Sequence, residues 1–162
     1  MNMKKILLLA LPLMAMCAVS CNKWTDDSPI IQFKDPKFLE GVLIGGYPAG
    51  DVDKNGDGQI SEKEASVVMG LELGGMGIRN LEEIKYFTAL TRLECSGNQL
   101  SSLNVNNNTA LTYLSCTNNQ LTSLDVSKNT ALIVLDCYEN QLTSLDVSKN
   151  TALTQLKCSA NQ

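Results

Sequence analysis

Hydrophobic positions recur with a period of 21 residues in the second half of the chain. Residues 88–108, 109–129 and 130–150 are full copies, and 151–162 is a partial one; each contains Leu-x-x-Leu-x-Cys-x-x-Asn-Gln. The alternation Leu-x-Cys predicts a short strand with both residues pointing inward. Because 21 residues leave little room for a full helix, we expect turns or 3-10 segments on the return path. Stacking of such coils would bury the apolar side chains that a single coil leaves exposed.

A divergent coil precedes the regular copies. Met76 stands where the later copies have asparagine, and the equivalent apolar places are taken by Leu71, Leu73, Ile78, Leu81, Ile84 and Phe87. The array is therefore predicted to start near Val67 and to cover residues 67–162, with its last repeat incomplete. The predicted fold is an α+β repeat protein, a short solenoid of 21-residue repeats with parallel strands on its concave face.

Two residue types are repeated inside the coils. The recurring asparagines should bond backbone groups at the turn after each strand, since buried backbone must be satisfied; they are Asn98, Asn119, Asn140 and Asn161. The recurring cysteines are Cys95, Cys116, Cys137 and Cys158. Strands about 4.8 Å apart spread four cysteines over roughly 14 Å, too far for one tetrahedral zinc. Parallel neighbours also hold Cβ atoms farther apart than the ~3.8 Å of a disulfide. We therefore interpret them as small buried hydrophobic residues.

The outward strand positions vary between copies while the inward ones hardly change. This contrast predicts a recognition face for a protein partner on a constant scaffold, although drift on an unconstrained surface is the alternative. Tyr113 and Tyr138 lie four strand positions apart, about 13 Å, so they do not form one sugar-stacking platform. The predicted binding face consists of Arg92, Glu94, Tyr113, Ser115, Thr117, Val134, Asp136, Tyr138, Gln155 and Lys157, with Gly70, Glu72, Gly74, Ser96 and Ser159 at the other outward positions.

Residues 53–64 have the pattern of a twelve-residue EF-hand calcium loop. Ca²⁺ takes six to eight oxygen ligands around a tight turn. An alternative register starting at Asp51 puts Gly58 at the eighth position, which needs an apolar residue, whereas the register starting at Asp53 puts Ile60 there. The predicted ligands are Asp53, Asn55, Asp57, Gln59, Ser61 and Glu64. A solvated acidic turn is the competing interpretation.

The calcium loop belongs to residues 36–66, a predicted EF-hand-like helical cap. Asp35 and Pro36 should begin a short entering helix that glycines interrupt before the loop, and a better helix should follow from Glu62 to about Met69. A single loop with a poor entering helix favours a structural role, closing the N-terminal end of the array, over a sensor role.

The N-terminus has the layout of an export signal. Lys4 and Lys5 precede an apolar run over residues 6–19, which predicts a lipoprotein signal peptide at residues 1–20. Ala18-Val19-Ser20-Cys21 resembles a lipobox, so Cys21 is the predicted site of lipidation and membrane attachment. An ordinary secretory cleavage near Cys21 is the alternative. Residues 21–35 are polar, show no sustained period and predict a tether.

Composition excludes several functions. The chain has no histidine, which removes His general bases, Ser-His and Cys-His nucleophile pairs and His-ligated zinc. The chain has 13 Lys and Arg against 17 Asp and Glu and no basic cluster, which argues against a nucleic-acid partner. Carboxylate pairs such as Glu94 and Asp136 would lie on an open face without a desolvated cleft. We therefore predict a binding protein and not an enzyme.

The repeat runs at residues 87–91 and 119–132, with the calcium loop and the lipobox, resemble the leucine-rich repeat surface lipoproteins of Bacteroidetes. The resemblance covers residues 36–162. It implies a lipid-anchored protein of the outer membrane, on the cell surface or its periplasmic face, that mediates protein–protein interaction or adhesion without catalysis. An accessory glycan-binding lipoprotein, or a truncated structural fragment without a ligand, are the alternatives. An uncapped last coil would expose Leu153, Leu156 and Cys158, and could form a dimer there.

Overall fold

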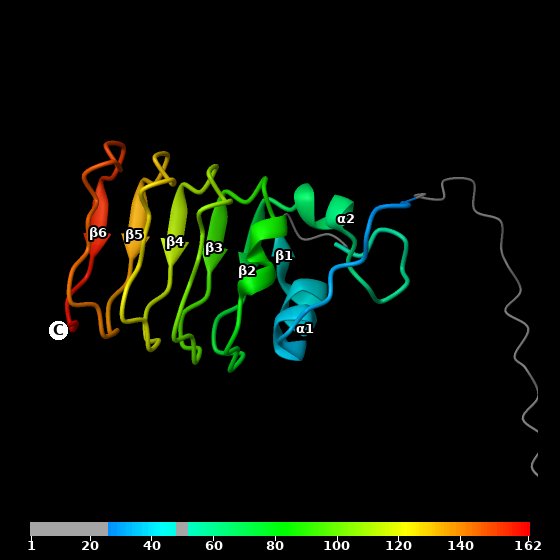
Figure 1. Cartoon of the computed structure of the whole chain (residues 1–162), viewed down its shortest axis with the longest axis horizontal. Helices are drawn as coiled ribbons and strands as arrows, with labels where there is room; N and C mark the ends of the chain where they lie inside the picture. Colours follow the sequence, from blue (N-terminus) through cyan, green and yellow to red (C-terminus); the bar gives the residue numbers. More distant parts are fainter. Residues whose placement is uncertain (1–25, 48–51) are drawn as a thin grey trace, which may run out of the picture.

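The computed structural model describes residues 26–47 and 52–162. Figure 1 shows a row of stacked coils with two short helices at one end. One six-stranded sheet in the order β1-β2-β3-β4-β5-β6 runs through the coils. Its strands are β1 Gly46–Tyr47, β2 Gly70–Glu72, β3 Arg92–Glu94, β4 Tyr113–Ser115, β5 Val134–Asp136 and β6 Gln155–Lys157. β1 is antiparallel to β2, and all later pairs are parallel.

Strand register repeats from coil to coil. Leu71 pairs with Leu93, Leu93 with Leu114, Leu114 with Leu135, and Leu135 with Leu156. The first step is therefore 22 residues and the later steps are 21. This register confirms the solenoid predicted from the 21-residue period.

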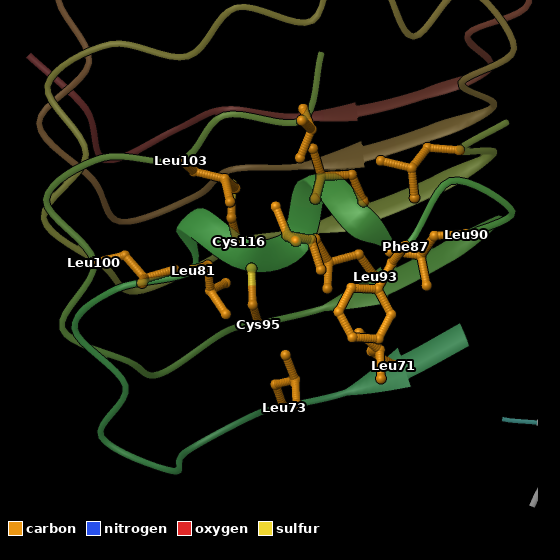
Figure 2. Close-up of a cluster of buried hydrophobic side chains, with 14 of the residues drawn as sticks. Leu71, Leu73, Leu81, Phe87, Leu90, Leu93, Cys95, Leu100, Leu103 and Cys116 are labelled. Carbon is orange, nitrogen blue, oxygen red and sulfur yellow. The ribbon is translucent and has the colours of Figure 1, made fainter. Parts of the chain in front are cut away.

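The core is a continuous column of inward side chains (Figure 2). Leucines of the strands point into it together with Cys95, Cys116 and Cys137, and all of these residues except Leu156 are fully buried. The return path is closed by one 3-10 helix, η1, over Glu82–Tyr86, and elsewhere by turns. The expectation of turns and 3-10 structure on the return path is confirmed.

The N-terminal end of the column is covered by α1, Pro36–Gly45. Asp35 caps this helix by accepting the Lys37 N–H at 3.0 Å. Phe38 and Val42 are fully buried, and the Phe38 ring lies 5.9 Å from that of Phe87 in the first coil. The helix approaches the sheet closely because position 41 is glycine: a Cβ there would meet Leu73 Cδ2 at 2.6 Å. Helix and coil therefore share one core.

The segment ahead of α1 packs against the loop instead of extending from it. Ile31 N–H donates to Ile60 O at 2.9 Å, and Glu62 N–H donates to Pro29 O at 2.9 Å. Ile30 forms an isolated antiparallel bridge with Ser61. The described part of the predicted tether, residues 26–35, is thus paired with the end of the calcium-loop sequence.

The predicted asparagine ladder is present. Asn119 Oδ1 accepts the Leu100 N–H at 3.0 Å, while its Nδ2 donates to Cys95 O and Cys116 O, each at 3.0 Å. The same arrangement recurs at Asn98, Asn140 and Asn161. Each of these amides therefore ties neighbouring coils together, and those of Asn98, Asn119 and Asn140 are buried.

A second asparagine ladder was missed by the sequence analysis. Asn129 Nδ2 donates to Val105 O at 3.0 Å and to Asn108 O at 2.9 Å, and Asn108 and Asn150 repeat this pattern. All three are buried, and their Oδ1 atoms have no hydrogen-bond partner in the described part of the chain. The signal was available, because these residues also recur every 21 positions in the Asn-Thr-Ala-Leu run.

Candidate functional site

The outward residues of β2 to β6 form one surface together with the residue that directly follows each repeat cysteine, or Leu73 in the first coil. We call this surface the strand face. Its sequence positions are those predicted as the binding face. Interactions on it run from coil to coil, so the surface is best described from the N-terminal end to the C-terminal end.

The N-terminal part of the strand face is organised by Arg92. Its Nε donates to Glu72 Oε1 at 2.7 Å, and its guanidinium lies 3.7 Å from the centre of the Tyr113 ring. The Glu72 carboxylate raises the pKa of Arg92. An ion pair and a cation–π contact thereby fix a charged and aromatic cluster across three neighbouring strands.

The C-terminal part of the strand face is organised by Asp136. Its Oδ1 accepts the Thr117 hydroxyl at 2.7 Å, and its Oδ2 lies 3.3 Å from Lys157 Nζ. Tyr138 lies next to this pair and is 38% exposed. The side chain of Glu139 raises the pKa of Tyr138. This half therefore presents a phenol, a carboxylate and an exposed lysine.

Not every predicted face residue is presented to solvent. Ser115 is only 5% exposed, and its hydroxyl lies 2.8 Å from that of Ser96. Ser115 is short and sits between larger neighbours, so it serves as a link between coils. Gln155 and Lys157 are exposed, whereas Arg92, Glu94, Tyr113, Thr117, Val134 and Asp136 are half-buried.

The calcium-loop sequence forms a tight turn around the carboxylate of Asp53. Its Oδ2 accepts the Gly58 N–H at 2.7 Å, and its Oδ1 accepts the Gly56 N–H at 2.8 Å. Gly56 and Gly58 both have positive φ, at 72° and 77°, which side-chain-bearing residues rarely adopt. Ile60, the residue that decided the register, is fully buried. The glycines are therefore placed where the turn requires them.

Glu64 reaches back to the start of the same turn. Its Oε1 accepts the Lys54 N–H at 2.8 Å, while its Oε2 accepts the Ser61 N–H at 2.9 Å. Ser61 and Glu64 form a capping box at the start of α2, Glu62–Ser66. Glu64 is fully buried and Asp53 nearly so, and no Lys or Arg of residues 26–47 or 52–162 lies within ion-pair distance of either.

The donor chemistry of the predicted ligands fits Ca²⁺, because Asp, Asn, Gln, Ser and Glu all offer oxygen atoms. Asn55 and Asp57 are exposed, and Asn55 Nδ2 donates to Asp57 Oδ2 at 3.0 Å. Within the described ranges no group of three or more Asp, Glu, Cys or His side chains converges as a metal site. The structure thus brings Glu64 to Asp53 but leaves Asn55, Asp57 and Gln59 at the surface.

The remaining predicted sites lie at the two ends of the chain. Cys21 and the signal sequence fall outside the described residues, and within those residues no helix is long and apolar enough to cross a membrane. At the other end, Leu156 is 42% exposed and Cys158 is exposed, unlike their fully buried equivalents in the preceding coils. The burial predicted for the repeat cysteines therefore holds for Cys95, Cys116 and Cys137, and Cys158 is exposed as predicted for an uncapped last coil.

The other three repeat cysteines, Cys95, Cys116 and Cys137, are buried in the core, which makes their thiols unreactive. Burial raises the pKa of Cys95 and Cys116 well above the ordinary thiol value, and it raises the pKa of Cys137 to about 11. Cys95 Sγ lies 3.3 Å from Ser115 O in the neighbouring coil. All four repeat cysteines are free, and thiols held protonated in a core act as packing groups.

Comparison with solved structures agrees with this architecture. The chain is similar to the functional domain of InlJ from Listeria monocytogenes, which includes a cysteine ladder: TM-score 0.65, 35% identity, 76% of this chain and 28% of that one. The chain has the leucine-rich repeat fold. An internalin, InlF, from the same organism gives TM-score 0.61 and 20% identity over 80% of this chain and 44% of that one. The leucine-rich repeat protein LIC12759 of Leptospira interrogans gives TM-score 0.50 and 28% identity over 52% and 23%.

The match is partial in length. The chain spans between about a quarter and just under half of the length of these solved proteins. No protein-family profile matches the chain, and no curated protein is similar to it. Leucine-rich repeat coils present an extended surface that suits protein partners, and these neighbours are repeat proteins of that kind.

Proposed function

We propose that the chain is a protein-binding module that uses the strand face and is held at the cell envelope by a lipid on Cys21. The observation that carries the binding proposal is the strand face itself. It presents Arg92 with Tyr113 at one end and Asp136 with Tyr138 at the other, on a sheet whose inward residues are nearly invariant. Aromatic and arginine side chains are the residues that most often dominate binding energy at protein interfaces.

Site-specific photo-crosslinking tests this proposal in producing cells. A benzophenone amino acid replaces Tyr113 or Tyr138 on the strand face, and Asn107 or Lys149 on the exposed return path serves as the matched position. We expect both tyrosine positions to crosslink the same partner protein and the return-path positions not to do so. Crosslinks of equal yield from both faces, or none from Tyr113 and Tyr138, would refute a strand-face interface.

The lipid anchor and the surface location need separate tests. Metabolic labelling with a fatty-acid probe should mark the full chain and fail to mark the Cys21→Ser variant. Protease added to intact cells should degrade the protein while an internal periplasmic control survives. Labelling that persists in Cys21→Ser would overturn the anchor site, and protection from protease would place the strand face inside the envelope.

We further propose that Asp53, Asn55, Asp57, Gln59, Ser61 and Glu64 hold one structural Ca²⁺. When bound, the ion would supply positive charge to the two buried carboxylates of Asp53 and Glu64. Their present N–H donors and the two left-handed glycines support the proposal, since they hold both carboxylates at the start of the turn. Residues 29–31 pair with Ile60 and Glu62, so a calcium-stabilised turn would also stabilise the N-terminal segment.

Thermal unfolding with and without calcium tests this site. A ligand at about 100 times its Kd stabilises the folded state by about 2.7 kcal/mol. We expect calcium to raise the Tm of the full chain and of Glu62→Ala, which changes a neighbouring carboxylate that is not a predicted ligand. The calcium-dependent rise should vanish in Glu64→Ala, whatever that variant's Tm without calcium. No rise in the full chain at millimolar calcium would refute the site.

The exposed last strand supports a proposal of self-association. Leu156 and Cys158 take the inward positions of the last coil, and both are exposed, whereas their equivalents in the earlier coils are buried. A second copy could pair with this edge. Sedimentation at increasing concentration should show a dimer that Leu156→Lys abolishes while Ile133→Lys, an exposed apolar residue away from the edge, does not. A monomer at all concentrations would exclude it.

A further inference from the structure

A pocket lies between the start of α1 and the turn after β2, away from the strand face. It has a volume of about 520 Å³ and is lined by Lys34, Asp35, Pro36, Lys37, Gly77, Arg79 and Asn80. This size falls within the range of small-molecule sites, roughly 300–1,000 Å³. Neither the binding proposal nor the calcium proposal uses any of its residues.

The pocket is basic in a chain that is acidic overall. Three of its seven lining residues are Lys or Arg, whereas the whole chain has a formal charge of −4. Asp35 is the single acid in the lining, and its carboxylate already accepts N–H groups of Lys37 at 3.0 Å, Arg79 at 2.6 Å and Asn80 at 3.2 Å. Backbone N–H groups thus satisfy the buried Asp35 carboxylate, so the cationic side chains of the lining do not have to pair with it.

The cationic side chains retain donors that the protein does not use. Arg79 donates its Nε to Gln99 Oε1 at 2.9 Å, and its two terminal nitrogens have no hydrogen bond within the described part of the chain. Lys37 Nζ has one distant contact there, 3.5 Å from Gly77 O. Lys34 is paired with Glu82 at the rim. Arg79 and Lys37 are therefore available to a ligand, whereas Lys34 would first have to leave its exposed ion pair with Glu82.

We infer that this pocket binds the phosphate group of a small phosphate ester, with Arg79 and Lys37 as its principal ligands and Lys34 at the rim. The guanidinium fork matches the oxygens of a phosphate, and lysine adds a point charge. A pocket of this volume exceeds the needs of a bare phosphate, and the proline ring and aliphatic lysine stems of the lining suit the organic part of an ester.

The substitutions that test the site should leave the fold intact. Asp35 is bonded to the backbone N–H groups of Lys37 and Arg79, so changing their side chains keeps the helix cap and its link to the first coil. The test variant is Lys37→Gln with Arg79→Gln. The matched control is Lys128→Gln with Lys149→Gln, which removes the same charge from two exposed return-path lysines. Circular dichroism and Tm would confirm that both remain folded.

Calorimetric titration at constant ionic strength measures binding, because salt screens such sites. The probes are glucose 6-phosphate, inorganic phosphate and, as an uncharged reference, glucose. We expect the full chain and the control variant to bind glucose 6-phosphate at least tenfold more tightly than glucose. The Lys37→Gln, Arg79→Gln variant should lose at least tenfold in Kd. Arg79→Lys should lose affinity although it keeps the charge, because it lacks the fork.

A change of opposite sign gives an independent test. Glu82→Gln releases Lys34 from its partner and should tighten glucose 6-phosphate binding several-fold. Tighter binding of the ester than of inorganic phosphate would assign the organic part to the pocket, and equal binding would reduce the site to the phosphate group alone. No binding by the full chain at millimolar ester, or equal losses in the pocket and control variants, would overturn the inference.

Discussion

Replacing Asn119 by alanine should remove one rung of the first ladder at a cost that the hydrogen bonds allow us to work out. Its Nδ2 donates to Cys95 O, Cys116 O and Thr117 O. Each of these carbonyls keeps another donor: the Nδ2 of Asn98 or Asn140, or the Gly97 N–H. Among the described residues, the Leu100 N–H has only Asn119 Oδ1 as a partner, and Leu100 lies in the core. The substitution therefore orphans one buried N–H group.

An orphaned buried N–H costs about 1–3 kcal/mol, and the lost carbonyl contacts bring the expected total for Asn119→Ala to about 2–4 kcal/mol. Asn129→Ala is the matched control, because it also truncates a buried asparagine. The Asn129 Oδ1 has no partner within residues 26–47 and 52–162, and Val105 O and Asn108 O keep the N–H groups of Asn108 and Leu111 as donors. No N–H group is orphaned, so we expect about 1 kcal/mol from the two lost bonds.

Urea unfolding followed by circular dichroism measures the difference. We expect Asn119→Ala to lower the free energy of unfolding by about 1–3 kcal/mol more than Asn129→Ala does, the range given for one unsatisfied donor. Asn107→Ala, on the exposed return path of the same coil as Asn108, should change it by less than about 0.5 kcal/mol. Equal costs for the two ladders, or a larger cost at Asn129, would refute the reasoning that the orphaned Leu100 N–H dominates.

Three further predictions concern single positions. Ile133 is 44% exposed and takes the place at which Thr112, one coil earlier, donates its Oγ1 to the preceding coil. Ile133→Thr should therefore add a hydrogen bond to Thr112 O and raise the free energy of unfolding by up to about 1 kcal/mol. A loss of stability of that size would contradict this prediction. Cys158 is exposed, so peptide-resolved alkylation of the native chain should modify it at least tenfold faster than Cys95, with equal rates in denaturant. Burial raises the pKa of Asp35, but the backbone N–H groups that bond its carboxylate outweigh this effect and hold the pKa below its ordinary 3.8. The folded state therefore binds fewer protons than the unfolded state. Asp35→Asn should destabilise the folded protein at pH 7, with a penalty that shrinks as the pH falls below about 3.8. A penalty at Asp35 that is independent of pH would show that shape and not charge matters there.

Much of the solenoid could be predicted from local sequence, because equivalent residues of successive repeats lie in the same environment. Leu93, Leu114 and Leu135 alternate with variable residues, and the inward pattern alone placed them in one column. The asparagine after each strand could be assigned to the backbone for the same reason. The 3-10 and turn content of the return path followed from the length of the period.

The N-terminal cap shows where local pattern was insufficient. The helix start at Asp35 was predicted, and the capping box at Ser61, which the sequence analysis did not name, was also readable, since both are contacts over two or three residues. That residues 29–31 pair with the calcium-loop sequence was not, because Ile31 and Ile60 are 29 positions apart and neither belongs to a repeat. The polar composition of residues 21–35 predicted a tether, but the two consecutive isoleucines at positions 30 and 31 pair with the end of the calcium-loop sequence.

What the sequence determined by itself is the scaffold: the period, the inward leucines and cysteines, and the first asparagine ladder, because each depends on spacing along the chain. Only the tertiary structure decided the surfaces. Asp35 reaches the backbone of Arg79 across 44 residues, Arg92 lies between Glu72 and Tyr113, and Ser115 is buried by its neighbours. Such contacts depend on which side chains the stacked coils bring together, and no period within one coil encodes them.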